Sequence, residues 1–180
     1  CSSPRLPQIA VTYEMPDQFI VVYDYIPGDT LEQVVAGNGR LSVVDTISIV
    51  KDIAEALSDL HLHGIVHCDL APNNIIIAAD GTHIIDFGIA QQIGACEDDV
   101  AKTASLGTWG FAAPEQYGFA AADQRSDIYS LAHLIGYMLC GVLPDKDDYK
   151  QVLSSLSDIP EGLVELIKKG TSFEPSARFQ

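Results

Sequence analysis

Apolar residues recur at helical spacing in several stretches of this chain, and each stretch predicts a helix. In residues 42–61 they fall on one face, at Ile47, Val50, Ile53, Ala54, Leu57 and Leu60. Ser42 is placed to cap this helix, and Gly64 follows it as a stop. Residues 127–140 are apolar nearly all round, which predicts a buried helix at the centre of the fold. Residues 163–169 predict a further helix that ends in lysines, where cations are favoured.

Shorter β-rich runs predict strands at residues 9–13, 19–25, 65–66, 75–77 and 83–85. The first two runs predict a hairpin, which the Pro-Gly-Asp sequence at residues 27–29 ends. The Asp-Gly pair at residues 80–81 predicts the turn between the last two runs. Residues 91–106 show no sustained period and predict a mobile loop.

The composition is that of a folded domain with an acidic surface. The chain has 180 residues, of which 47% are hydrophobic and 19% charged, so one domain or one lobe with a real core is expected. The formal net charge of −15 argues against nucleic acid and anionic membranes as partners. The longest apolar stretch, residues 128–143, is interrupted and falls short of the ~20 residues that span a bilayer.

The cysteines form no CxxC pair and stand at Cys1, Cys68, Cys96 and Cys140. They are too few for a disulfide scaffold, so we expect a reducing, cytoplasmic location. A zinc site built from His61, His63, His67 and Cys68 is the less favoured interpretation of the histidines. His61 and His63 lie two residues apart at a helix end, so their side chains point to different faces.

Three polar residues lie on loops that hairpins can bring together, and they carry the candidate chemistry. Asp69 and Asn74 share a short loop, and Asp86 follows the next predicted hairpin. Carboxylate and amide oxygens are the ligands that Mg²⁺ prefers, and a sparse Asn-plus-Asp site suits a metal–nucleotide complex. Asp69 would then face the substrate as a weak base that orients a hydroxyl, which is sufficient for phosphoryl transfer.

The segment from His67 to Asn74 resembles the catalytic loop HRDLKPxN of eukaryotic-type (Hanks-type) serine/threonine protein kinases. Residues 86–88 match the Asp-Phe-Gly motif of that family. Four more segments follow the family's order. Residues 19–31 resemble its strand and hinge, and residues 107–115 resemble the end of its activation segment with Ala-Pro-Glu. Residues 127–131 resemble the start of its central helix, and residues 175–179 resemble its late Arg motif. The motif style is that of a bacterial relative.

The resemblance implies a mainly α, α+β protein-kinase-like fold. Residues 1–25 would be the last two strands of the N-lobe. Residues 26–180 would be the helical C-lobe, with the catalytic β-hairpins, activation segment and central helix. ATP and Mg²⁺ are the implied cofactors, and a protein with a Ser or Thr hydroxyl is the implied substrate.

The resemblance also implies roles for individual residues. Asp69, Asn74 and Asp86 would be the catalytic residues, with Asn74 and Asp86 as metal ligands that also hold the nucleotide. Glu115 and Arg178 would form a buried ion pair that braces the lobe.

The adenine site is implied in the same way. The backbones of Asp24 and Ile26 would meet the adenine, Tyr23 would be the gatekeeper, and Ile76 would form the floor of the pocket. Thr108 fits the Ser/Thr-specific branch of the family.

The chain departs from the family pattern at three points. Cys68 replaces an Arg that usually pairs with a phosphorylated activation loop, which predicts activation without that switch, although Thr103 and Ser105 stay open as phosphosites. Ala71 replaces a Lys that contacts the transferring phosphate, which predicts weaker transition-state stabilisation. No Gly-rich phosphate loop and no strand Lys precede the hinge, so we expect a fragment that binds ATP poorly and transfers phosphate slowly or not at all.

Two other functions stay open at this point. Cys68 and Ala71 are also compatible with a pseudokinase or regulatory binding module. A small-molecule phosphotransferase of the aminoglycoside or choline type shares the Asp and Asn constellation, although such enzymes generally lack the Ala-Pro-Glu segment and the late Arg. The predicted hairpin of the kinase-like fold has no partner strands, so its edge would be exposed and we expect the chain to dimerise through it.

Overall fold

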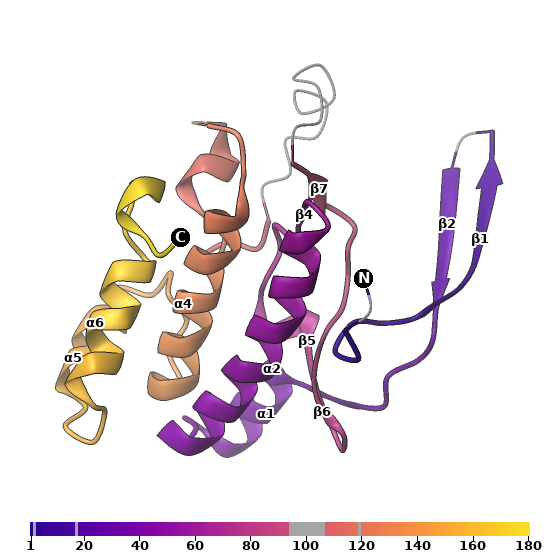
Figure 1. The fold of residues 1–180 in the computed structure, drawn as a ribbon. Helices are drawn as coiled ribbons and strands as arrows, with labels where there is room; N and C mark the ends of the chain where they lie inside the picture. Colours follow the sequence, from indigo (N-terminus) through magenta and orange to yellow (C-terminus); the bar gives the residue numbers. More distant parts are fainter. Residues whose placement is uncertain (2, 17, 94–106, 119) are drawn as a thin grey trace.

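Helices form most of the body, and a two-stranded hairpin stands out from one side of it (Figure 1). The computed structural model describes residues 1, 3–16, 18–93, 107–118 and 120–180. Its α-helices are α1 (Leu31–Asn38), α2 (Val43–Leu62), α4 (Gln124–Cys140), α5 (Tyr149–Ser155) and α6 (Glu161–Gly170). Short 3₁₀ turns lie at Pro72–Asn74, Pro114–Tyr117 and Pro175–Ala177. Within the described ranges, none of these helices combines the length and apolarity that a bilayer span requires.

Helix α4 lies in the centre of the core, which confirms the prediction from its apolar sequence. It begins at Gln124 because Asp123 caps it: the Asp123 carboxylate accepts a hydrogen bond of 2.8 Å from the N–H of Arg125. From Ser126 onward most of its side chains are buried. A Cβ added to Gly170 of α6 would lie 2.5 Å from the Cβ of Ala132, so α6 packs directly on α4.

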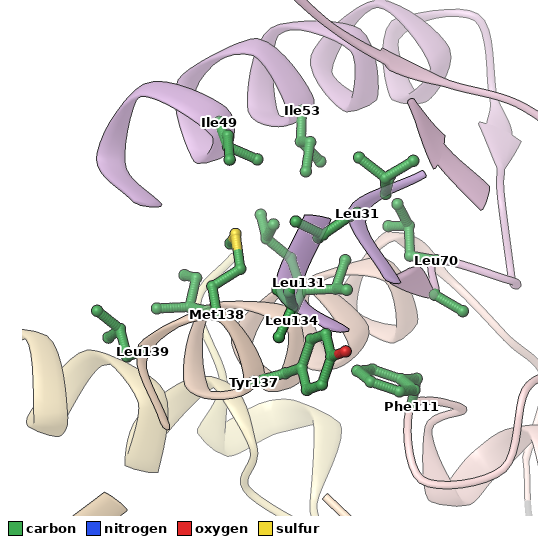
Figure 2. Packing of buried hydrophobic residues seen from close by; sticks show 14 of the residues in the cluster. Leu31, Ile49, Ile53, Leu70, Phe111, Leu131, Leu134, Tyr137, Met138 and Leu139 are labelled. Atoms are coloured by element: carbon green, nitrogen blue, oxygen red, sulfur yellow. The ribbon is translucent and has the colours of Figure 1, made fainter. Parts of the chain in front are cut away.

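Apolar side chains from several segments meet around α4 (Figure 2). The labelled members are Leu31, Ile49, Ile53, Leu70, Phe111, Leu131, Leu134, Tyr137, Met138 and Leu139. The ring of Phe111 meets that of Tyr137 edge-on at 6.0 Å, which ties the activation-segment region to the core. Each fully buried Leu or Ile contributes about 1.5–3 kcal/mol to folding. The loop that contains Leu70 and the segment that contains Phe111 are therefore packed on the apolar core.

Helix α2 forms as predicted, with Ser42 as its cap and Gly64 in the left-handed conformation at φ 72° after its end. The Ser42 hydroxyl oxygen accepts a bond of 3.1 Å from the N–H of Asp45. Its buried face is rotated from the predicted one. Ile47 and Ala54 are exposed. The residues that α2 buries are Thr46, Ile49, Ile53, Ala56, Leu57 and Leu60.

The predicted first hairpin is formed by β1 (Ile9–Met15) and β2 (Gln18–Tyr23), which pair antiparallel. Nearly every residue of both strands is exposed. The exposed side chains include large apolar ones, such as Phe19 at 63% and Ile9 at 61%. The hairpin stands away from the helices (Figure 1), and these apolar side chains lie outside the core.

The hairpin ends before Pro27, in line with the predicted break, but Gly28 begins a further strand that the sequence did not predict. Strand β3 (Gly28–Thr30) pairs antiparallel with β5 (Ile75–Ala78), which in turn pairs with β6 (Gly81–Ile84). A Cβ on Gly28 would lie 2.5 Å from the carbonyl oxygen of Ile77, so only glycine permits this approach.

Strand β4 (Ile65–Val66) pairs with β7 (Gln91–Gln92). The first two residues of the predicted loop 91–106 are therefore in a strand. Residues 94–106 of that loop lie outside the described residues.

The segment before β1 runs back along the helical body. The N–H of Ser3 donates to the Asp59 carboxylate at 2.8 Å, and the N–H of Ile84 donates to the carbonyl of Arg5 at 3.0 Å. The Arg5 guanidinium forms an ion pair of 3.0 Å with Asp52 on α2. These contacts attach the chain ahead of the hairpin to α2 and β6.

Candidate active site

The buried carboxylate of Asp127 holds the loop between β4 and β5. Asp127 of α4 is fully buried and accepts hydrogen bonds from the backbone N–H groups of His67 and Cys68, at 3.0 and 2.9 Å. His61, at the end of α2, donates from Nε2 to the same carboxylate at 2.8 Å. Cys68 has a φ of 66°, a left-handed conformation that this bonding stabilises. The loop is thus fixed to the central helix.

His67 is a neutral histidine packed in the core. Its Nδ1 accepts from the N–H of Asp69 at 3.2 Å, so the ring proton lies on Nε2, which donates to the carbonyl of Ile85 at 3.2 Å. Burial lowers the pKa of His67, although Asp127 acts in the opposite direction. The ring of Phe87 meets it edge-on at 5.0 Å. His67 therefore links the Asp69 loop to the segment around Asp86.

Among the described residues, His61, His63, His67 and Cys68 do not come together as a group that could hold a metal ion. His61 is bonded to Asp127, and His63 to the carbonyl of Asp59 at 2.7 Å. Burial, with a further contribution from Asp127, raises the pKa of the Cys68 thiol to about 12, which makes a thiolate ligand unfavourable.

The Asp69 carboxylate lies between the end of its own loop and the activation-segment region. Thr108 donates to its Oδ1 twice, from the backbone N–H at 2.8 Å and from the hydroxyl at 2.7 Å. The Asn74 amide donates to its Oδ2 and to its backbone carbonyl, both at 2.9 Å. Asp69 is therefore a preorganised acceptor, with Oδ2 still able to take a further hydrogen bond.

Asn74 and Asp86 are brought to the same end of the β5–β6 hairpin. Ile75 pairs with Ile84, and beyond this pair the N–H of Ile85 donates to the carbonyl of Asn74 at 2.9 Å. Asp86 comes next, exposed and with a φ of 65°, and its Oδ1 accepts from the N–H of Gly88 at 3.0 Å. The three predicted catalytic residues, Asp69, Asn74 and Asp86, thus gather at one place.

The donor set fits a hard cation. The Nδ2 of Asn74 is committed to Asp69, so its Oδ1 is the amide atom available to a metal. In the described ranges, neither Asp69 nor Asp86 forms an ion pair. The Asp86 carboxylate, together with the Asn74 amide oxygen, is the ligand chemistry that Mg²⁺ prefers.

The residues expected around adenine lie on connected elements. The N–H of Asp24 donates to the carbonyl of Gln8 at 3.0 Å and extends the β1–β2 pairing into the hinge. Ile26 follows and is half-buried. Ile76 is 8% exposed and pairs with Thr30, so β3 carries the chain from the hinge directly onto the strand of Ile76.

A buried ion pair with Arg178 anchors the 3₁₀ turn Pro114–Tyr117. Arg178 donates from both terminal nitrogens to the two carboxylate oxygens of Glu115, at 2.7 and 2.9 Å. The Ser126 hydroxyl donates to the same carboxylate at 2.7 Å. Burial raises the pKa of Glu115, but the bonds from Arg178 and Ser126 outweigh it and hold this pKa below its usual range.

Sequence reasoning missed two residues of the site. The side chain of Gln116 donates to the carbonyl of Cys68 at 2.6 Å, from a position 48 residues later in the chain. His61 was considered only as a metal ligand, although it donates to Asp127. No spacing rule indicates either contact, because both join segments far apart in sequence.

Comparisons with known proteins agree with this geometry. The family described as "Protein kinase domain" matches residues 1–178. Serine/threonine-protein kinase PknD of Mycobacterium tuberculosis is 30% identical over 194 residues, which cover 99% of this chain and 29% of the relative. The probable serine/threonine-protein kinase PknB of Lactococcus lactis is 28% identical over 193 residues, which cover 99% of this chain and 30% of the relative.

A third relative matches over a shorter range. Serine/threonine-protein kinase PknB of Mycobacterium tuberculosis is 35% identical over 130 residues, which cover 71% of this chain and 21% of the relative. The chain therefore spans less than a third of the length of the curated relatives it matches. With a family match along nearly the whole chain, this protein belongs to the protein kinase domain family.

Proposed function

We propose that this chain carries the catalytic centre of a serine/threonine protein kinase, which transfers the γ-phosphate of ATP to a protein hydroxyl. The observation that supports this most directly is the Asp69 carboxylate, which Thr108 and Asn74 hold in place. Relatives named serine/threonine-protein kinases align with 99% of the chain.

The proposed roles follow from the geometry. A bound Mg²⁺–ATP would supply the phosphoryl group and neutralise its charge. Asn74 would bind the metal through Oδ1, and Asp86 would bind it through its exposed carboxylate. Asp69 would accept the substrate hydroxyl on Oδ2, orient its oxygen and take its proton. Catalysis would then rest on positioning and charge, which phosphoryl transfer mainly needs.

The nucleotide base would lie beside the hinge. The backbone groups of Asp24 and Ile26 would meet the adenine, and Ile76 would form the floor of its pocket. The approach of β3 to β5 supports this assignment, because it brings the hinge segment to the strand of Ile76.

We also propose that the chain divides into parts of two kinase lobes. Residues 1–25, with the exposed β1–β2 hairpin, would be N-lobe strands, and residues 26–180 would form a mainly helical C-lobe. The free thiols of the described cysteines, Cys1, Cys68 and Cys140, support a reducing, cytoplasmic setting. The exposed apolar hairpin supports self-association of this chain through a strand edge.

A binding module with little or no activity is the second candidate, and Ala71 favours it. Ala71 is fully buried, and no Lys or Arg stands in residues 67–74. The loop itself therefore brings no cation to the transferring phosphate, which lowers the expected rate.

The test is transfer of labelled γ-phosphate by the protein in its natural full length, with Mg²⁺, to a Ser/Thr protein substrate. Wild type is compared with Asp69→Asn, and with Asp147→Asn as a control at an exposed aspartate. We expect Asp69→Asn to lose about 10²–10⁴-fold in rate and Asp147→Asn to lose none. Equal activity of wild type and Asp69→Asn would exclude the kinase proposal. Phosphate found on an amino sugar or choline, and none on protein, would replace it with a small-molecule phosphotransferase.

A further inference from the structure

The side chain of Gln116 is buried and both ends of its amide are bonded. It lies on the 3₁₀ turn Pro114–Tyr117 and is 8% exposed. Its Oε1 accepts from the N–H of Ala113 at 3.0 Å, and its Nε2 donates to the carbonyl of Cys68 at 2.6 Å. Burying an amide is costly unless its hydrogen bonds are made, so the burial holds this side chain in one arrangement.

The carbonyl that Gln116 binds belongs to the peptide group directly before Asp69. The other end of that peptide group is the N–H of Asp69, which donates to Nδ1 of His67 at 3.2 Å. The preceding peptide group is held by Asp127 through the N–H of Cys68. Rotation of the Cys68–Asp69 peptide group would move the Asp69 side chain. The bond from Gln116 to the carbonyl and the bond from the N–H to His67 hold the two ends of this peptide group and oppose the rotation.

Gly107, the residue before Thr108, packs closely against the hydrogen bond between Gln116 and the Cys68 carbonyl. A Cβ added to Gly107 would lie 3.0 Å from the carbonyl oxygen of Cys68 and 3.2 Å from Nε2 of Gln116. The φ of Gly107 is 58°, so its backbone turns sharply at this contact. Cys68 precedes Asp69, and Gly107 precedes Thr108. Both lie beside Nε2 of Gln116, next to the hydrogen bonds that join Asp69 and Thr108.

We propose that Gln116 is a positioning residue for phosphoryl transfer. Its Nε2 donor fixes the peptide group before Asp69 against the segment that carries Thr108. This role rests on the proposed kinase function, and it is distinct from the roles of Asp69, Asn74 and Asp86, which would touch substrate or metal. The link is a neutral amide to a backbone carbonyl, so it operates without a charged side chain at residue 68 and without a modified group on the activation segment.

A purely structural role for Gln116 would use a different atom. Capping of the 3₁₀ turn needs only Oε1, which accepts from Ala113, whereas positioning of Asp69 needs the Nε2 donor. Gln116→Glu keeps the acceptor and replaces the donor by an oxygen that repels the Cys68 carbonyl. Gln116→Met removes both functions at similar length. Gln151→Glu, at an exposed position on α5, controls for the added charge.

The experiment measures kcat and KM for ATP in the full-length protein, together with hydrogen exchange of the Thr108 and Ala113 amides. For Gln116→Glu we expect kcat to fall on the order of 10- to 100-fold with KM for ATP unchanged. We expect the Thr108 amide to exchange roughly tenfold faster, and the Ala113 amide to stay as slow as in wild type. Gln116→Met should speed exchange at both amides, and Gln151→Glu at neither.

Wild-type exchange at Thr108 in Gln116→Glu would overturn the positioning role, whatever the activity. Equal kcat in wild type and Gln116→Glu would overturn it as well. If wild type is no more active than Asp69→Asn, the proposed kinase function fails instead. The exchange data would in that case still decide whether Gln116 fixes the Asp69–Thr108 contact.

Discussion

Thr108 and Asp69 lie 39 residues apart in sequence, yet the Thr108 hydroxyl donates a hydrogen bond of 2.7 Å to Oδ1 of Asp69. The Thr108 N–H donates a second one of 2.8 Å to the same oxygen. This oxygen is therefore occupied by Thr108. The other oxygen, Oδ2, is shared with Asn74 and is the one that we assign to the substrate hydroxyl.

Removal of the Thr108 hydroxyl should slow phosphate transfer without unfolding the protein. In Thr108→Val the hydroxyl bond is lost while the backbone bond remains, so Asp69 is held less firmly. Because hydrogen bonds to charged groups are worth about 1.5–3 kcal/mol, we expect a loss of roughly 10- to 100-fold in kcat. Thr108→Ser keeps the hydroxyl and should stay close to wild type. Full activity of Thr108→Val would contradict this role.

Removal of the buried Arg178 should destabilise the protein strongly. Arg178→Met leaves the Glu115 carboxylate buried at 4% exposure without its partner, which costs about 3–5 kcal/mol. We expect Tm to fall by roughly 10 °C or more in thermal unfolding. Arg40→Met is the matched control, because the Arg40–Asp158 pair has side chains 42% and 56% exposed and contributes little to stability. Similar Tm losses in both variants would contradict a bracing role for Arg178.

His133 should make the protein less stable in mild acid. Burial, followed by the charges of Lys150 and Arg178, lowers the pKa of His133 to about 4 from 6.5. The unfolded chain binds a proton at His133 more readily than the folded chain does. The free energy of unfolding is therefore highest, as far as His133 is concerned, above about pH 6.5, and it falls as the pH is lowered towards 4. The shift corresponds to about 3 kcal/mol.

Urea unfolding of wild type and His133→Phe at pH 7 and pH 4.5 measures this contribution. Phe retains ring contacts like those of His133 with Tyr129 at 4.6 Å and Tyr149 at 5.9 Å. We expect the variant to lose less stability than wild type between the two pH values. His67 titrates in the same direction in both proteins, so it cancels in the difference. An identical pH dependence would show that His133 is not the titrating group.

The β1–β2 hairpin should mediate self-association of the 180-residue chain. Its apolar side chains are exposed, among them Ile9 at 61%, Tyr13 at 53% and Phe19 at 63%. We expect sedimentation coefficients that rise with concentration for wild type, and a monomer for the double variant Ile9→Lys with Phe19→Lys. A wild-type monomer at every concentration would exclude this association.

The parts of the fold that follow from local pattern are the ones that the sequence predicts well. Helix α2 forms with its predicted cap at Ser42, and the predicted strands around the Asp69 loop all form. Helix α4 also forms as a buried helix, although it begins at Gln124 and not at the predicted residue 127. The gathering of Asp69, Asn74 and Asp86 was also predictable, because short hairpins separate them. Asp127, which holds the loop, lies within the segment that resembles the family's central helix.

Contacts between distant segments were not predictable. Strand β3 forms only because Gly28 lets the chain approach Ile77, and a Pro-Gly-Asp sequence otherwise predicts a break. Ile47 has a suitable helical position but faces solvent, since the neighbours of α2 decide which of its faces is covered. The bonds of Thr108 to Asp69 and of Gln116 to Cys68 depend on where residues 107–118 fold back, which no local pattern encodes.

The most direct test of the central claim is the steady-state rate of γ-phosphate transfer to a Ser/Thr substrate, measured against Mg²⁺–ATP concentration in the full-length wild type, Asp69→Asn and Asp86→Asn. The proposed roles predict that Asp69→Asn lowers kcat by about 10²–10⁴-fold with little change in KM for Mg²⁺–ATP. They predict that Asp86→Asn, which loses a metal ligand, raises that KM as well as lowering kcat. Wild-type rates in either variant would contradict the assignment of this site to phosphoryl transfer.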